Sequence, residues 1–220
     1  MIAAAYIVLA YLIGSFPSAV TLGRLIWHTD VRKHGSGNAG ATNAWRVLGW
    51  KAGLTILIID AGKGALAAGI VPNLPLGAPS LDLPILAVLC GVAAVVGHVF
   101  PIYTRFRGGK GVATAAGMLV VIAPIPIGCA VGVFAIAVVA SGIVSLGSIL
   151  AAWTLPIAAV LLSAFTDAAY PSLLFGLTFA LAAFITYTHR KNISRLIRGE
   201  ERSFPQLQLW RRLRSWGKFV

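Results

Sequence analysis

Residues 34–46 read HGSGNAGATNAWR, and this polar stretch stands between two long apolar runs, 2–23 and 48–71. Its glycines free the backbone to turn several N–H groups toward one point, and its Asn, Ser and Thr side chains add short hydrogen-bonding groups. Arg46 adds a planar charge that can bind an anion through two parallel hydrogen bonds. The stretch therefore predicts a loop that binds phosphate.

A flexible linker between two apolar runs would explain the glycines of this stretch. It would leave unexplained the five polar side chains that occur together with them, namely Ser36, Asn38, Thr42, Asn43 and Arg46. Gly35, Gly37 and Gly40 also spell GxGxxG, but the dinucleotide-binding version of that pattern needs a preceding strand in a βαβ unit. An apolar run of membrane-spanning length precedes it here, so a dinucleotide fold is not expected.

The composition of the whole chain indicates a membrane protein. Charged residues make up 11% of the 220 residues and hydrophobic residues 58%, whereas charged residues form about 25% of an ordinary soluble domain. We expect an all-α integral membrane protein whose residues 1–203 form a single multi-span domain. About seven transmembrane helices are predicted from apolar runs that approach the required length of about 20 residues, at 2–23, 48–71, 83–100, 111–124, 126–144, 149–164 and 171–188.

The basic residues predict how the chain is oriented in the bilayer. The net charge is +12, and of 18 Lys and Arg residues five lie within 24–51, three within 105–110 and nine from residue 190 onward. Because cytoplasmic loops carry the excess of Lys and Arg, these segments should face the cytoplasm. The N-terminus is then outside and the C-terminus cytoplasmic, and the charge has no need of a nucleic-acid partner.

The last segment, 204–220, is expected to form a basic amphipathic tail on an anionic leaflet. A disordered basic tail is the alternative. The expectation rests on apolar residues that alternate with basic ones, namely Leu209, Trp210, Leu213 and Trp216 with Arg211, Arg212, Arg214 and Lys218.

A second polar stretch, 97–111, reads GHVFPIYTRFRGGKG and also lies at the end of an apolar run. Lys110 between glycines suits a second phosphate. The stretch is not a Walker A loop, because Thr104 stands where the first glycine belongs and Gly111 replaces the Ser or Thr that would hold magnesium. Arg105 and Arg107 fit either this site or simple anchoring at the inner membrane face.

A third polar stretch, 189–201, reads HRKNISRLIRGEE and leaves the last apolar run. His189 and Asn192 are three residues apart, so they share one face if the helix continues. Ser145 and Ser148 precede this stretch in the chain and supply hydroxyl groups at the same membrane face.

Asp60 and Lys63 lie one turn apart inside an apolar run, which predicts an ion pair within the membrane. The pair either locks helices together or serves function, and it is the best argument for the alternative that the protein transports an organic phosphate. Transporters usually place their site near the membrane midplane between repeats. Since the polar stretches here gather at one face, an enzyme is favoured over a transporter.

The three stretches SGNAGATNAWR, GHVFPIYTRFRGGKG and HRKNISRLIRGEE together closely resemble the bacterial glycerol-3-phosphate acyltransferases that use acyl phosphate as donor. The resemblance implies an enzyme of the bacterial cell inner membrane, with seven spans and an active site facing the cytoplasm. It would acylate the sn-1 hydroxyl of glycerol 3-phosphate, giving 1-acylglycerol 3-phosphate and inorganic phosphate in phospholipid biosynthesis. The implied partners are acyl phosphate, glycerol 3-phosphate and membrane lipid, with no metal, cofactor or nucleic acid and with a monomer as the expected state.

The same resemblance implies the site residues. The expected catalytic residues are Ser36, Arg46, Lys110, His189 and Asn192. The expected phosphate-binding residues are Gly37, Asn38, Gly40, Thr42, Asn43, Gly108, Gly109, Ser148 and Glu201. Spacing favours Ser148 over Ser145 and Glu201 over Glu200.

Two points of chemistry can be argued from the residues themselves. The base that deprotonates the glycerol hydroxyl is either His189 or a phosphoryl oxygen of the donor, and the scarcity of inner carboxylates favours the donor. Acyltransferases that use acyl-CoA rely on a His followed five positions later by Asp. None of the four histidines has Asp at that offset, which argues against CoA thioesters as donors.

Overall fold

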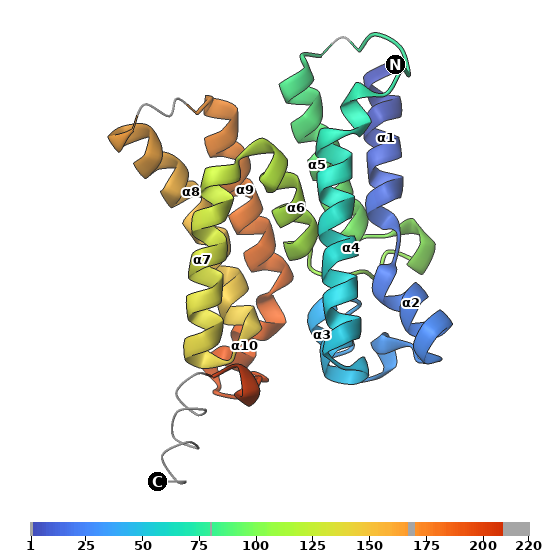
Figure 1. Ribbon diagram of the computed structural model, residues 1–220, viewed down its shortest axis with the longest axis vertical. Helices are drawn as coiled ribbons and strands as arrows, with labels where there is room; N and C mark the ends of the chain where they lie inside the picture. The colour runs from blue at the N-terminus through green and yellow to red at the C-terminus, as the bar shows by residue number, and fades with distance from the viewer. Residues whose placement is uncertain (1, 80, 167–169, 209–220) are drawn as a thin grey trace. The chain divides into compact units, whose positions relative to one another are not determined.

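A computed structural model describes residues 2–79, 81–166 and 170–208, and over those residues the chain is helical without β-strands (Figure 1). It forms two compact units, Met1–Pro124 and Ile125–Val220. The single domain predicted for 1–203 remains a prediction.

The first apolar run folds as two helices, α1 (Ile2–Ser15) and α2 (Ser18–Trp27), with a break at Phe16 and Pro17. Proline has no N–H group and cannot continue the hydrogen bonding of a helix interior. The backbone carbonyl of Phe16 instead accepts a hydrogen bond of 2.9 Å from the ammonium group of Lys63. A side chain of another helix thus satisfies a polar group that the break exposes, as an apolar environment requires.

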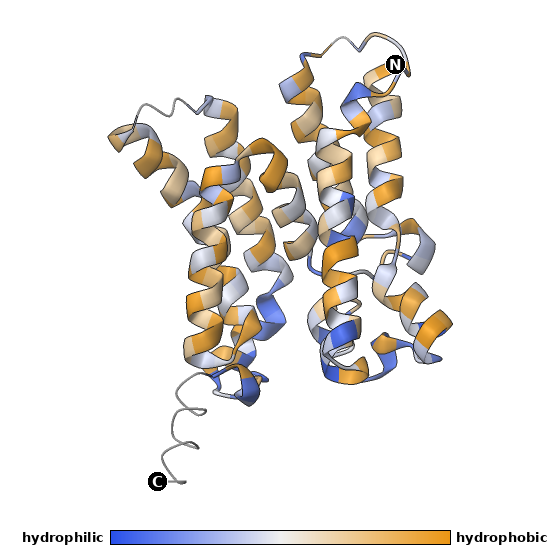
Figure 2. Cartoon of the chain, viewed as in Figure 1, coloured by the Kyte–Doolittle hydropathy of each residue, from blue (hydrophilic) through white to orange (hydrophobic). Residues whose placement is uncertain are grey.

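The remaining helices of the first unit follow the predicted order. The 3₁₀ helix η1 (Val31–Lys33) and the short helix α3 (Ala41–Leu48) lead into α4 (Trp50–Gly69), and η2 (Val71–Asn73) follows α4. Next come α5 (Leu83–Val99), η3 (Ile102–Thr104) and α6 (Val112–Ile122). Hydrophilic residues gather at the end of this unit that holds η1, α3 and the start of α4 (Figure 2).

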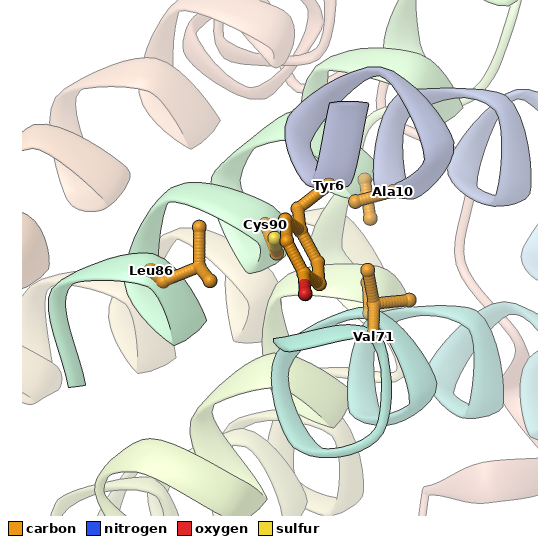
Figure 3. Packing of buried hydrophobic residues seen from close by; sticks show 7 residues of the cluster. Tyr6, Ala10, Val71, Leu86 and Cys90 are labelled. Carbon is orange, nitrogen blue, oxygen red and sulfur yellow. The ribbon is translucent and has the colours of Figure 1, made fainter. Parts of the chain in front are cut away.

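Small residues bring the helices of this unit into close contact, as in other membrane proteins. A methyl group added at Gly14 of α1 would overlap the backbone of Ala94 on α5, and one at Gly117 of α6 would overlap the carbonyl of Ala61 on α4. Figure 3 shows Tyr6 packed beside Val71, Leu86 and Cys90. The single hydroxyl proton of Tyr6 is shared between two carbonyls, those of Leu74 at 2.7 Å and Gly77 at 2.9 Å.

The second unit contains α7 (Pro124–Ser141), which begins at the unit boundary, α8 (Val144–Phe165), α9 (Ser172–Thr188) and α10 (Arg190–Ile197). Helices α9 and α10 meet at an angle of 64°. In this unit, hydrophilic residues gather around α10 (Figure 2).

Residues 204–208 return to the turn between α7 and α8. The backbone N–H of Phe204 donates to the carbonyl of Gly142 at 2.7 Å, and the Gln208 side chain donates to that of Ser141 at 2.5 Å. A 3₁₀ helix, η4 (Pro205–Leu207), joins these two contacts. The rest of the predicted amphipathic tail, 209–220, lies outside the described residues.

Five helical segments within the described ranges are long and apolar enough to cross a membrane, and six if the bent pair α9 and α10 is one span. The predicted span at 111–124 corresponds to α6, which has 11 residues. At 1.5 Å per residue this helix is about 16 Å long, against a hydrocarbon core of about 30 Å. The all-α membrane fold is therefore confirmed, whereas the count of seven spans is not.

Candidate active site

The first polar stretch is held together by Asn43, whose side chain is buried. Its amide nitrogen donates to the carbonyls of Val31 at 2.7 Å and His34 at 3.1 Å. Its amide oxygen accepts from the backbone N–H of Ser36 at 2.8 Å. Both donor hydrogens are thus used inside the loop, so the structure places Asn43 as the group that shapes the loop.

Two glycines of this loop adopt a backbone conformation that L-residues rarely adopt. Gly35 has φ +61° and Gly37 has φ +72°, in the left-handed region where a side chain costs free energy. A methyl group at Gly35 would also overlap the amide oxygen of Asn43. Glycine at this position therefore allows both the turn and the hydrogen bonding of Asn43.

The predicted contact residues are distributed around this turn. Ser36 is exposed, whereas Asn38, Thr42 and Arg46 are half-buried. Helix α3 begins at Ala41 without a side-chain cap, so the first N–H groups of the helix point out of its N-terminus. Arg46 lies one turn along α3 from Thr42. The segment thus combines the N–H groups at the start of a helix, a hydroxyl group and a guanidinium group.

Asp30 holds together the segment that precedes this loop. Its carboxylate accepts hydrogen bonds from Arg32 at 2.8 and 3.0 Å and from Arg24 at 2.7 Å. The hydrogen bonds from Arg32, which outweigh burial, hold the pKa of the Asp30 carboxyl well below its ordinary value. Asp30 is therefore ionised at neutral pH and neutralises part of the charge of the two arginines.

The second polar stretch is pressed against the C-terminal end of α5. The N–H groups of Gly108 and Gly109 donate to the carbonyls of Val99 at 3.2 Å and His98 at 3.1 Å. A methyl group at Gly108 would overlap the carbonyl of His98, and one at Gly109 would overlap the His98 ring. Only glycine allows the chain to approach α5 this closely.

Lys110 is half-buried and lies between this contact and the start of α6. Gly111, with φ +85°, forms the turn into the helix. Arg105 and Arg107 are both exposed, and Arg105 occupies the left-handed region with φ +54°.

A buried polar cluster lies beneath this second loop. The ammonium group of Lys63 is 2.9 Å from a carboxylate oxygen of Asp60 and 3.3 Å from Nδ1 of His98. The hydroxyl group of Ser18 donates to the same carboxylate oxygen at 2.5 Å. The predicted ion pair between Asp60 and Lys63 is thus present, with partners from α2 and α5.

In the second unit, Glu201 is the centre of the polar contacts. Its carboxylate accepts from Ser145 at 2.8 Å, from Asn192 at 2.6 Å and from Arg195 at 2.7 Å. Burial disfavours the charged form, but these hydrogen bonds outweigh it and hold the pKa of the Glu201 carboxyl below its ordinary value. Glu200 instead pairs with Arg198 on the surface.

His189 lies where α9 ends and α10 begins, and it is almost fully buried. Its Nδ1 atom is 2.8 Å from the carbonyl oxygen of Ile185. A carbonyl only accepts hydrogen bonds, so Nδ1 carries a proton. In the neutral ring the lone pair is then on Nε2, which is the arrangement that a base would need.

The two candidate serines have different partners. Ser148 donates to the carbonyl of Val144 in its own helix at 2.9 Å, whereas Ser145 contacts Glu201. Sequence reasoning missed the partnership of Ser145 with Glu201, because both serines lie on one face of α8. The structure also pairs Arg195 with Glu201.

No group of three or more His, Cys, Asp or Glu side chains that could hold a metal ion occurs within residues 2–79, 81–166 and 170–208.

Comparison with known proteins extends the resemblance to nearly the whole chain. Residues 4–199 match the model of the family described as glycerol-3-phosphate acyltransferase. The chain belongs to the glycerol-3-phosphate acyltransferase family.

Curated members of this glycerol-3-phosphate acyltransferase family are similar over most of their length. The glycerol-3-phosphate acyltransferase of Chlorobaculum tepidum is 46% identical, and the match covers 90% of this chain and 94% of the relative. That of Chlorobaculum parvum is 44% identical with the same coverage.

Solved structures of a glycerol-3-phosphate acyltransferase share the fold. The crystal structure of PlsY, an integral membrane glycerol 3-phosphate acyltransferase, in its glycerol 3-phosphate form has a TM-score of 0.77 and 31% identity, and the match covers 92% of this chain and 95% of PlsY. Its lysophosphatidic acid form gives a TM-score of 0.76 and 32% identity, with coverage of 94% and 97%. This chain therefore shares the fold of an integral membrane protein, and within the described residues it has five helical segments long and apolar enough to cross a membrane.

Proposed function

We propose that this protein transfers an acyl group from acyl phosphate to the sn-1 hydroxyl of glycerol 3-phosphate. The products are 1-acylglycerol 3-phosphate and inorganic phosphate, and the reaction belongs to phospholipid biosynthesis. The enzyme acts at the cytoplasmic face of the bacterial inner membrane. The observation that carries the proposal is the pair of glycine-built loops, 34–46 and 108–111, in a chain of the glycerol-3-phosphate acyltransferase family.

The acceptor follows from the family and from its structural relatives. PlsY has been crystallised in a glycerol 3-phosphate form and a lysophosphatidic acid form, which are the acceptor and the product of such a transfer. A loop that offers helix-end N–H groups, Thr42 and Arg46 suits the phosphate of this acceptor.

The donor is argued from the chemistry that the chain offers. No histidine is followed five positions later by aspartate, so the arrangement typical of acyl-CoA enzymes is missing from the sequence. A second phosphate loop containing Lys110 is suited to a donor that itself carries a phosphate. An acyl phosphate is a mixed anhydride and is already activated, so no covalent enzyme intermediate is needed.

The basic residues reduce the electrostatic repulsion between the two substrates, which is the main physical difficulty of this reaction. Two phosphorylated substrates bring several negative charges together, and each pair at 4 Å repels by about 4 kcal/mol at an effective dielectric near 20. Arg46 and Lys110 offset this repulsion. N–H groups of the first loop, together with Ser36, would stabilise the oxyanion that forms on the carbonyl, and such a donor is typically worth about 2.7–4 kcal/mol.

The bond changes require one proton acceptor. The glycerol oxygen attacks the acyl carbon, the bond between that carbon and the bridging phosphate oxygen breaks, and the hydroxyl proton passes either to the leaving phosphate or to Nε2 of His189. We favour the phosphate, with His189 and Asn192 orienting the acceptor. A His189→Gln enzyme should therefore keep substantial turnover with an unchanged pH profile, and a near-complete loss of turnover would instead identify histidine as the base.

The test of the donor uses purified full-length protein in lipid. Inorganic phosphate and lipid product are measured with glycerol 3-phosphate and palmitoyl phosphate, and in parallel with palmitoyl-CoA. The proposal expects product with palmitoyl phosphate and none with palmitoyl-CoA. Product with palmitoyl-CoA alone would overturn the donor assignment.

A further inference from the structure

We propose that His98, held by the ion pair of Asp60 and Lys63, positions the second phosphate loop, 108–111. The three are positioning residues, since they act through the backbone of the loop. The inference rests on the proposed function in one respect, which is that this loop binds a substrate phosphate. All of the groups concerned lie in the first unit.

Lys63 is the centre of the arrangement, because its ammonium group joins three helices. It donates to the carbonyl of Phe16 at the break between α1 and α2, it pairs with Asp60 in its own helix, and it lies 3.3 Å from Nδ1 of His98 on α5. The side chain is 6% exposed and that of Asp60 is 1% exposed. A charge pair this deeply buried is costly unless its groups are well hydrogen-bonded, and here they are.

His98 links the cluster to the loop through two contacts. One is the hydrogen bond from the N–H of Gly109 to the His98 carbonyl at 3.1 Å. The other is the ring itself, whose far edge with Nε2, Cε1 and Cδ2 lies where a methyl group on Gly109 would stand. The near edge of the ring, at Nδ1, faces Lys63. A movement of the Lys63 side chain would therefore displace the His98 ring, and the ring would in turn displace Gly109.

A simple lock between helices would not account for this geometry. Close contacts of small residues already join α4 to α6, since a methyl group on Gly64 would overlap the carbonyl of Thr114 and one on Gly117 that of Ala61. The polar cluster instead contacts the one end of α5 that carries the glycine loop. The contact of this cluster with Gly109, the residue before Lys110, is explained if the cluster fixes the position of the loop.

The first experiment measures hydrogen exchange of the loop in the intact protein. His98→Ala removes the ring, and the double change Asp60→Asn with Lys63→Gln removes both charges without leaving one buried alone. In both variants the amides of Gly108 and Gly109 should exchange faster, whereas the amide of Ser36 in the first loop should keep its rate. Unchanged exchange at Gly108 and Gly109 would overturn the proposal.

The second experiment measures KM and kcat for each substrate. The proposal expects KM to rise by on the order of tenfold to a hundredfold for one phosphorylated substrate, because misplacing a group by about 1 Å can cost about a hundredfold. KM for the other substrate should stay within about twofold. An equal fall in activity toward both substrates, without a change in either KM, would mean that the cluster only locks helices.

Two steric changes test the contact between His98 and Gly109 without replacing Asp60 or Lys63. Gly109→Ala alone forces the loop away from the His98 ring, and His98→Ala alone removes the support. In the double variant, the methyl group that Gly109→Ala adds occupies part of the space that the His98 ring has left. The KM of the double variant should therefore be closer to the wild-type KM than the KM of either single variant. Simple multiplication of the two defects would show that the residues are not coupled.

Tyr6→Phe is the matched control, because it removes a buried hydroxyl that bonds to Leu74 and Gly77 in the connection between α4 and α5. It should lower Tm but leave both KM values and the exchange of Gly108 and Gly109 unchanged. The exchange experiment also separates the two proposals. If wild-type protein made no product from either donor while His98→Ala still accelerated exchange of the loop, the proposed function would fail and the positioning role would stand.

Discussion

At the scale of single residues, Asn43 joins three backbone groups in and next to the first loop, and two of these bonds, to Val31 and His34, need the N–H groups of its amide. Asn43→Asp keeps the shape but removes both N–H donors to Val31 and His34. We expect a loss of about 3 kcal/mol in the free energy of unfolding, because two carbonyls lose their partners and that of Val31 is buried. Activity measured under folded conditions should fall as well, since Ser36 moves with the loop.

Asn73→Asp is the control for this change. Asn73 is exposed and donates to the carbonyl of Gly69 at 2.9 Å. Its replacement should alter the free energy of unfolding by about 0.5 kcal/mol or less. Equal effects of the two changes in denaturant titrations would show that Asn43 does not shape the loop.

Glu201 allows a second prediction at this scale. Glu201→Gln removes the negative charge that faces Arg195 and places there either an amide N–H group or a neutral oxygen. Because the charged hydrogen bond to Arg195 is lost, we expect a loss of about 2 kcal/mol in the free energy of unfolding. Glu200→Gln, in an exposed pair with Arg198, should cost about 0.5 kcal/mol or less. Thermal unfolding of both variants beside the wild type measures the difference.

The pH dependence of stability gives a separate test of Glu201. Its pKa is lower in the folded protein than the ordinary value of 4.5, so the unfolded carboxyl takes up protons first as the pH falls. The stabilisation is complete above that ordinary value and is lost as the pH falls through the folded pKa. Wild-type Tm should therefore fall more steeply than that of Glu201→Gln from about pH 6 to about pH 3. Parallel curves would contradict the assignment.

Residue types could be predicted here from the sequence, but their partners could not. The glycines, Asn43 and Arg46 stand out in 34–46 because nothing else in an apolar chain needs them. That the Asn43 amide bonds to its own loop depends on a turn at Gly35 that no spacing reveals. Ser145 and Ser148 are equally good hydrogen-bond donors by type, and only the folding back of residue 201 onto α8 distinguishes them.

At the scale of elements, the crossing of α4 and α6 depends on glycine. Gly117→Ala would place a methyl group on the carbonyl of Ala61, so the helices must separate or bend. We expect a loss of about 1–3 kcal/mol in the free energy of unfolding, as overpacking usually costs. Thermal unfolding in detergent is the measurement.

Gly62→Ala on α4 is the matched control, because no atom lies within 4 Å of the added methyl group. Alanine is the better helix former, so Tm should stay the same or rise. If both changes lowered Tm equally, the close crossing of α4 and α6 would not explain the effect of Gly117→Ala.

Element boundaries were harder to predict than element existence. The sixth run was expected at 149–164, whereas α8 spans Val144–Phe165, because Ser148 donates to the carbonyl of Val144 and so fits inside the helix. The first run was expected to be continuous, but Pro17 divides it. The length of an apolar run does not indicate that a serine inside it will hydrogen-bond to its own helix. Nor does it indicate that the chain will break at Phe16 and Pro17, where Lys63 binds the carbonyl of Phe16.

At the scale of the whole molecule, the distribution of Lys and Arg predicts a cytoplasmic C-terminus and an outer N-terminus. In protein with Cys90 and Cys129 replaced by alanine, a cysteine at the exposed position Ala78 should react with an impermeant thiol reagent in intact cells. A cysteine at the exposed position Lys33 should react only after the membrane is opened. The reverse pattern would refute the orientation, and equal labelling of both after permeabilisation is the control.

The placement of Asp60 and Lys63 on one helix has a consequence for biogenesis. A charged side chain at the centre of a span costs about 2.5–3.5 kcal/mol when the translocon releases the segment into lipid. These two are three residues apart and 2.9 Å from each other, so they can neutralise one another as soon as α4 coils. The carbonyl of Phe16 has by then already been synthesised, whereas His98 has not. Helix α4 can therefore leave the translocon before α5 is made, and the loop that His98 supports forms only after α5 has followed.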